Sequence, residues 1–322
     1  MKAILRILPK RLTVILITLL LISLLIFGIT QILPGDAAFM MLGQWSNPEA
    51  LAKLRDQMGL DDPFWVQYLK WLTNFIQGDF GKSLTMGIPV KPIIMDHLAH
   101  SLVLGLFSFC GIAVFGILLG VLCGIKKDSW FDQMVSSLGF IGVSIPEFVS
   151  GSLLVLLFAG SVWQIFPAGG YTPLTEGFWP WLSRLILPSV TLMLVLFAYV
   201  VRMTRSSIIE VLETNYVRTA RLKGLDEKWV IIRHALRNAL MPTVTLLANN
   251  FGWLMGGIVV VETVFSFPGL GRLTILAIQK RDIPMIQASI LITAFIYIFA
   301  NLLADLLYMI LDPRTRTESV SY

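Results

Sequence analysis

The amino-acid sequence predicts an all-α integral membrane protein with about six transmembrane helices, and two observations support this fold class. Only 14% of the 322 residues are charged and 56% are hydrophobic, whereas a soluble chain carries about 25% charged residues. Six strongly apolar stretches also lack Asp, Glu, Lys and Arg, and most are about as long as the ~20 residues that cross a bilayer as a helix. They are residues 12–35, 101–125, 148–175, 185–201, 238–261 and 283–304. A soluble enzyme is therefore not expected.

The first apolar stretch follows four basic residues, as the apolar part of a signal peptide would. It is longer than the roughly 7–15 apolar residues of a typical signal peptide, and Leu33-Pro34-Gly35-Asp36 lacks the pattern of a cleavage site. We therefore expect a first transmembrane helix that stays in the mature protein.

The basic residues are distributed unevenly between the two sides of the predicted membrane. Six spans put both termini on one side, and that side carries sixteen of the 25 Lys and Arg residues, eight of them between the fourth and fifth stretches. The positive-inside rule places this side in the cytoplasm. The net charge of +5 then follows from topology, and no nucleic-acid partner is expected.

The first and second stretches are separated by an external segment, residues 34–97, that is too long for a bare connection. Its apolar spacing predicts short amphipathic helices. One should begin at Pro48-Glu49 and end at Met58-Gly59, and a second should begin at Pro63 and continue through Gln77. We expect a small external helical subdomain.

The internal segment, residues 202–240, contains a short isolated helix in the prediction. Asn215 is a candidate N-cap and Gly224 a candidate C-terminal stop, which leaves about two helical turns between them. Asp226 can cap the next helix, which is amphipathic. Because two turns are marginally stable alone, the short helix needs a partner surface in this chain or on another protein.

Three further patterns are weak signals for chemistry. Gly78–Ser83 resembles a phosphate-binding loop, but the glycine that the pattern requires is replaced by Ile76. His97 and His100 are three residues apart, without the convergent Cys or carboxylate ligands of a typical metal site, so no metal site is predicted. Cys110 and Cys123 lie about 20 Å apart along one helix, too far for a disulfide, and we expect both to be buried.

Acidic residues in or near the predicted spans are candidates for the transport pathway or its gate, since carboxylates inside a membrane are costly. They are Glu147, Glu262 and Asp305. The alternative is that each lies close enough to a boundary to be solvated or to bond a neighbouring helix. Pro146 should break or kink the helix before Glu147. Gly116, Gly120 and Gly124 form one small-residue face, typical of close helix packing in lipid.

The internal segment resembles a known family. Arg218 to Gly224 reads Arg-Thr-Ala-Arg-Leu-Lys-Gly and is similar to the cytoplasmic loop of ABC-importer permeases, whose pattern begins Glu-Ala-Ala and reaches Gly after three more residues. Arg218, Thr219 and Arg237 depart from the Glu, Ala and Pro of the general pattern, as is usual in the dipeptide/oligopeptide/nickel branch. Segments similar to that branch run in order along nearly the whole chain. They are 33–36, 59–63, 78–83, 202–207, 233–239, 262–272, 281–284, 305–308 and 311–314.

This resemblance implies the permease subunit of a binding-protein-dependent type I importer in the bacterial cytoplasmic (inner) membrane. The implied partners are a second homologous permease subunit, two ABC ATPase subunits and an external solute-binding protein. ATP and Mg²⁺ would be bound by the ATPases, so this chain would be no enzyme and would bind no cofactor. The resemblance makes the short helix an ATPase-coupling element. Its residues are Tyr216, Arg218, Thr219, Ala220, Arg221, Leu222, Lys223, Gly224 and Leu225.

We accordingly divide the chain into three parts. They are residues 1–97 (first helix and external subdomain), residues 98–312 (the transmembrane domain with coupling loop 202–240) and residues 313–322 (a cytoplasmic tail). A secondary transporter or channel, or a membrane receptor, remains an alternative that lacks an ATPase partner. Within the family, di- or oligopeptides are the expected cargo, with nickel, glutathione, opines and sugars as alternatives.

Overall fold

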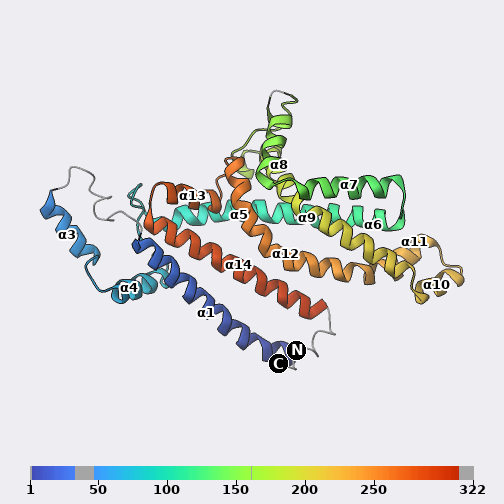
Figure 1. Cartoon of the computed structure of the whole chain (residues 1–322), viewed down its shortest axis with the longest axis horizontal. Coiled ribbons are helices and arrows are strands. Elements are labelled where there is room, and N and C mark those ends of the chain that lie inside the picture. Colours follow the sequence, from blue (N-terminus) through green and yellow to red (C-terminus); the bar gives the residue numbers. More distant parts are fainter. Residues whose placement is uncertain (1, 33–46, 161, 312–322) are drawn as a thin grey trace. The chain divides into compact units, whose positions relative to one another are not determined.

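The computed structural model describes residues 2–32, 47–160 and 162–311, and these ranges are almost entirely helical (Figure 1). The tail at 313–322 and the Leu33–Asp36 motif lie outside the described residues. The helices are α1 Lys2–Ile32, α3 Pro48–Met58, α4 Phe64–Ile76, α5 Val90–Gly111, α6 Ile117–Ile125, α7 Trp130–Ser144, α8 Glu147–Leu154, α9 Phe178–Leu212, α10 Asn215–Leu222, α11 Glu227–Trp229, α12 Leu236–Val264, α13 Leu270–Gln279 and α14 Ile283–Leu311. Short π-helical segments are η1 Ile112–Gly116, η2 Val155–Ala159 and η4 Val230–Ala235, and η3 Leu174–Glu176 is a 3₁₀ turn.

Five helical segments in the described ranges are long and apolar enough to cross a membrane, and a bent pair of helices makes a possible sixth. The five are Pro9–Ile32, Val90–Ile125, Phe178–Leu212, Glu227–Val264 and Ile283–Leu306, and the pair is Trp130–Ser144 with Glu147–Ala159. The predicted all-α fold with about six spans is confirmed.

The third span differs from its prediction over 148–175. The helix ends at Ala159, and the described residues in the remainder of the apolar stretch are irregular apart from η3. Gly160, Pro167 and Pro173 interrupt helical hydrogen bonding there. The sixth candidate span instead combines α7 with α8 and η2, and α7 joins α8 through the expected break at Pro146 with a bend of 110°.

The described chain divides into two compact units. Unit 1 comprises residues 1–101 and 268–298, and unit 2 comprises residues 102–267 and 299–322.

Unit 1 contains the two predicted external helices. Asn47 caps α3 by accepting a hydrogen bond from the Glu49 amide (3.2 Å), and Gly59 ends it with φ +64°. The next helix, α4, packs against α1, where the Tyr68 and Ser23 hydroxyls are 2.8 Å apart. The Phe27 ring of α1 contacts three aromatic rings of α4. The helical pattern predicted for this segment is confirmed where it is described.

A polar contact in unit 1 anchors the loop between α4 and α5. The buried Asp282 carboxylate accepts hydrogen bonds from the Ser83 hydroxyl, the Leu84 amide (3.2 Å), and the amide (3.3 Å) and hydroxyl (2.9 Å) of Thr85. Several donors compensate the cost of burying this charge. A contact between residues almost 200 positions apart therefore holds the loop to the turn between α13 and α14.

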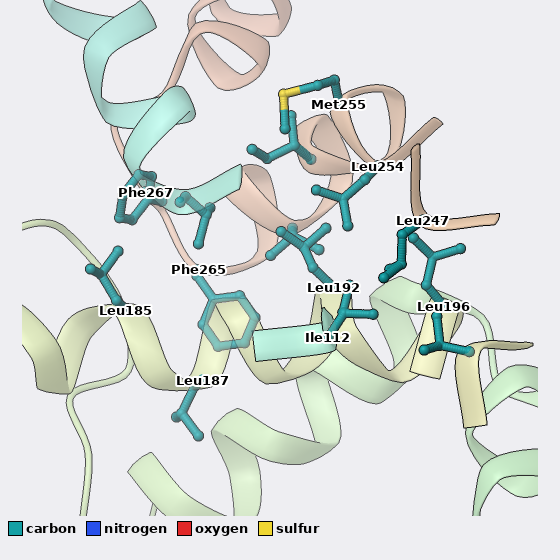
Figure 2. Close-up of a cluster of buried hydrophobic side chains, with 14 residues drawn as sticks. Ile112, Leu185, Leu187, Leu192, Leu196, Leu247, Leu254, Met255, Phe265 and Phe267 are labelled. Carbon is teal, nitrogen blue, oxygen red and sulfur yellow. The ribbon is translucent and has the colours of Figure 1, made fainter. Parts of the chain in front are cut away.

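Unit 2 is built around α9 and α12, whose buried apolar side chains form its core (Figure 2). Leu192 and Leu196 of α9 lie among Leu247, Leu254 and Met255 of α12, with Phe265 beside them. These contacts bury the inner faces of both long helices and hold them together.

Glycines allow α6 to lie directly on α9. A Cβ added at Gly120 would be 2.5 Å from the Thr204 Cβ and 2.9 Å from the Val201 carbonyl oxygen, closer than real contacts allow. Gly116 and Gly124 are similarly close to α9 side chains. The predicted small-residue face is confirmed as a helix-packing surface.

Candidate coupling site

The segment between α9 and α12 presents a short helix, α10, at one end of unit 2 (Figure 1). The predicted start is wrong by one residue: Thr214 is the N-cap, with extended backbone angles of φ −71° and ψ 152°. The Thr214 hydroxyl donates to the Val211 carbonyl (2.6 Å) and so satisfies the end of α9. The predicted stop is confirmed, because Gly224 has φ +78°.

One face of α10 is buried. Val217 is fully buried, Ala220 is 6% exposed, and both pack against Val230 at the start of η4. Val211 and Leu212 at the end of α9 complete this small cluster. The partner surface that a two-turn helix needs is thus supplied partly within the chain.

The opposite face of α10 is exposed and includes a large apolar side chain. Leu222 is 81% exposed and Tyr216 43% exposed, and Leu225 beyond the glycine is 39% exposed. The other predicted coupling residues on this surface are also exposed; they are Arg218, Thr219, Arg221, Lys223 and Gly224. Ala220 is the exception, since it faces the cluster beneath the helix.

An ion pair fixes the end of α10 to its surroundings. The Arg221 guanidinium donates to both Glu227 carboxylate oxygens (3.0 and 2.6 Å) and to the Leu212 carbonyl (3.3 Å). The hydrogen bonds from Arg221 to Glu227 raise the pKa of the guanidinium, which stays charged at physiological pH. Arg221 therefore ties α10 both to the end of α9 and to the start of α11.

Tyr216 makes a second connection, at the start of α10. Its hydroxyl accepts a hydrogen bond from the Asn238 side-chain amide (3.0 Å) and donates a longer one to the His234 carbonyl (3.4 Å). The helix predicted to begin after Asp226 contains a π-helical segment, η4, before α12, and such segments are frequent at functional sites. Tyr216 therefore connects the start of α10 to η4 and α12.

The acidic residues predicted for the pathway occupy three different helices. Glu147 is the first residue of α8 and is partly exposed, with its carboxylate against Gly257 of α12. A Cβ added at Gly257 would be 2.9 Å from that carboxylate, so the glycine provides room for it. Glu262 of α12 is completely buried, and Asp305 of α14 is partly exposed.

The weaker sequence signals have structural explanations. The Nδ1 atoms of His97 and His100 lie 2.8 and 3.1 Å from backbone carbonyls, and the described residues contain no cluster of three metal-ligating side chains. Ser83 of the phosphate-loop-like segment binds a carboxylate, which would repel phosphate. Cys123 is buried as predicted, but Cys110 is exposed because it lies on the outward side of α5.

Sequence analysis missed the ionic contacts that connect these elements. The Arg205 guanidinium of α9 binds both carboxylate oxygens of Asp132 of α7 (2.6 and 2.7 Å), and Asp132 is buried. Ser129, which caps α7 by accepting from the Asp132 amide (3.3 Å), was a local signal for that helix start. No local pattern relates Asp132 to Arg205 or Arg221 to Glu227.

The long apolar helices indicate a multi-pass membrane protein, and α10 is a short helix with one exposed face. Comparison with family models identifies the class: residues 116–317 match the binding-protein-dependent transport system inner membrane component, and residues 4–104 match the N-terminal region of such components. The chain belongs to this family. It is the permease subunit of an ATP-driven, binding-protein-dependent importer, as its motifs predicted.

Full-length relatives have the same kind of role. A putative peptide transport system permease protein of Brucella abortus is 40% identical over 93% of this chain and 95% of the relative. The glutathione transport system permease protein GsiC of Salmonella typhimurium is 38% identical over 95% of this chain and 97% of the relative. A solved structure of an amino acid ABC transporter with histidines aligns with a TM-score of 0.47 and 18% identity, covering 68% of this chain and 94% of that one.

Proposed function

We propose that α10 and the following residues through Leu225 dock onto a separate ABC ATPase and transmit its motion to the transport pathway. The observation that carries this proposal is that α10 has two different faces. One face is buried against the rest of the chain, and on the other face the Leu222 side chain is 81% exposed. Tyr216 and Leu225 are exposed on the same short segment, and a group of exposed apolar side chains outside the membrane spans marks a surface that binds another protein.

The hydrogen bonds of Arg221 and Tyr216 suggest how the motion of an ATPase is transmitted to this chain. ATP binding would close the ATPases and move the docked helix, and Arg221 and Tyr216 would carry the displacement into α9 and α12 as a rigid-body change. In this proposal the ATPases bind ATP and Mg²⁺, and this chain performs no bond chemistry. The complete assembly has two such ATPases, a second homologous permease subunit and an external solute-binding protein.

The proposed orientation places both termini and α10 in the cytoplasm. It rests on the excess of Lys and Arg residues on that side.

The proposed cargo is a short peptide, because relatives that align over nearly the whole chain are named for peptide or glutathione transport. Among the acidic residues, we propose Glu147 for the pathway, since its carboxylate is partly exposed beside a glycine of α12.

Substitution Leu222→Glu tests the docking proposal in the complete complex reconstituted in vesicles. It places a charge at the centre of the proposed contact, and we expect ATP-driven uptake to fall about tenfold or more, as for an interface hot spot. Less ATPase should also co-purify with the permease. Leu222→Met is the matched control, since it keeps the size and apolar character and should leave both measurements unchanged.

Normal uptake and normal ATPase recovery with Leu222→Glu would contradict the docking role of this face. Loss of the folded permease itself is checked by recovery of the second permease subunit, which should be unchanged because Leu222 is exposed.

A further inference from the structure

Unit 2 contains a cavity of about 490 Å³ between α7 and α9, away from the proposed coupling surface. Its volume is in the range of small-molecule sites, about 300–1,000 Å³. The lining changes character along the helices: Asp132, Arg202 and Arg205 line a polar part, and Phe140 and Ala198 line an apolar part.

A contact between α7 and α9 marks each of the two parts of the cavity. The Asp132–Arg205 ion pair joins the helices in the polar part. In the apolar part Gly139 packs against Ala198, where an added Cβ would be 3.1 Å from the alanine Cβ. Seven residues of α7 separate these contacts, so the graded lining extends over roughly 10 Å along the helix.

Arg202 is the basic residue of this lining that has no ion-pair or hydrogen-bond partner among the described residues. Arg205 is already neutralised by Asp132, and the other acidic residue of the lining, Asp128, also faces Arg205 at 3.7 Å. Arg202 is exposed and makes no hydrogen bond or ion pair with the part of the chain that the structure describes. The lining therefore carries two carboxylates and two guanidinium groups. Both carboxylates face Arg205, so among the described residues Arg202 is the guanidinium of the lining that no carboxylate pairs with.

The position of Arg202 along α9 places this guanidinium at a membrane boundary. It is the first charged residue after the charge-free stretch 185–201, which is about 25 Å long as a helix. The apolar part of the cavity lies on the side of Arg202 toward this charge-free stretch, beside Phe140, which is 59% exposed. A ligand here would contact lipid tails at one end and the level of the lipid head groups at the other.

We propose that this cavity binds a glycerophospholipid, with its phosphate on Arg202 and the start of an acyl chain between α7 and α9. Arginine binds phosphate through charge-assisted hydrogen bonds, and basic pockets between transmembrane helices bind phospholipid head groups. The apolar part then accommodates the chain, which inorganic phosphate lacks. This inference goes beyond the proposed function and does not depend on which side of the membrane Arg202 faces.

The test uses the complete transporter purified in detergent, with dioleoyl phosphatidylglycerol as the probe. Bound lipid is counted by native mass spectrometry, and the melting temperature of the permease is followed in parallel. We expect the wild-type complex to retain the lipid and to melt at a higher temperature when it is added. Dioleoylglycerol, which lacks the phosphate, and inorganic phosphate, which lacks the chains, should each fail to reproduce the shift.

Arg202→Gln should weaken lipid binding about tenfold, the loss of a hydrogen bond to a charged group. Arg202→Lys should retain most of the binding. Lys10→Gln is the matched control, because it removes an exposed basic side chain elsewhere in the chain and should change nothing.

Three results would overturn the proposal. They are equal lipid binding by wild type and Arg202→Gln, a melting shift of equal size with inorganic phosphate, and a loss of the second permease subunit from the Arg202→Gln complex. The last result would mean that the cavity accommodates the other subunit rather than a lipid.

Discussion

At the residue scale, Gly224 shows how a single backbone conformation shapes the proposed coupling site. Its φ of +78° ends α10 and directs the chain toward Glu227. A Cβ added there would meet no atom within 4 Å, so any effect of substitution comes from the backbone conformation and not from a clash. Glycine adopts this conformation without the cost that a side chain imposes.

Substitution Gly224→Val should reduce ATP-driven uptake by the reconstituted complex severalfold. A β-branched residue at positive φ costs roughly 1–2 kcal/mol, and relief of that strain would displace the end of α10 and its Arg221 contact. Gly224→Asn is the control, because asparagine tolerates this conformation and should retain most of the activity. Equal uptake by the valine and asparagine variants would show that the helix stop does not matter for coupling.

At the element scale, long-range polar contacts hold segments that would otherwise be loops. Asp282 is the clearest example, since its buried carboxylate binds three consecutive residues of the loop between α4 and α5. The loop contains one isolated β-bridge, between Lys82 and Pro89, and little other regular structure. Its order therefore depends strongly on one side chain.

Substitution Asp282→Ala should expose this loop to proteolysis. With the acceptor removed, local opening becomes easier, and we expect trypsin to cleave after the exposed Lys82 about tenfold faster, the loss of one or two hydrogen bonds to a charge. The rate is measured on the purified protein by mass spectrometry of the fragments. Asp61→Ala is the control, since Asp61 forms an exposed ion pair with Arg55 outside the loop; similar cleavage of both variants would refute the anchoring role.

At the scale of the whole molecule, the distribution of charge predicts the topology. The side that is predicted to carry both termini and α10 has sixteen of the 25 basic residues, which favours a cytoplasmic location. Two exposed residues that the predicted topology puts on opposite sides of the membrane are suitable probe positions, Lys53 of α3 and Lys223 at the end of α10.

Single cysteines at these positions test the topology in a chain whose Cys110 and Cys123 are replaced by alanine. A membrane-impermeant maleimide should label Lys53→Cys in cells with a permeable outer layer and an intact inner membrane. It should label Lys223→Cys only after the inner membrane is opened. Labelling of Lys223→Cys in intact cells would reverse the proposed orientation.

Prediction from sequence succeeded where the information is local or periodic. Five of the six charge-free stretches coincide with continuous helical spans, and the Gly59 and Gly224 stops follow from glycine's backbone freedom. It failed for the third span, where the run of apolar residues concealed helix-breaking Gly160, Pro167 and Pro173. Absence of charge indicates a membrane environment, but it does not ensure that a helix is continuous.

The sequence by itself determined the membrane environment, the helical fold class, the family and the position of the short helix. Each of these depends on composition, spacing or a contiguous motif. The tertiary structure decided which face of α10 is exposed and that Arg221 ties it to Glu227 and α9. It also decided that Asp132 and Arg205 lie at the cavity beside Arg202. These are pairings between separate segments, and they exist only once apolar packing has brought the helices together.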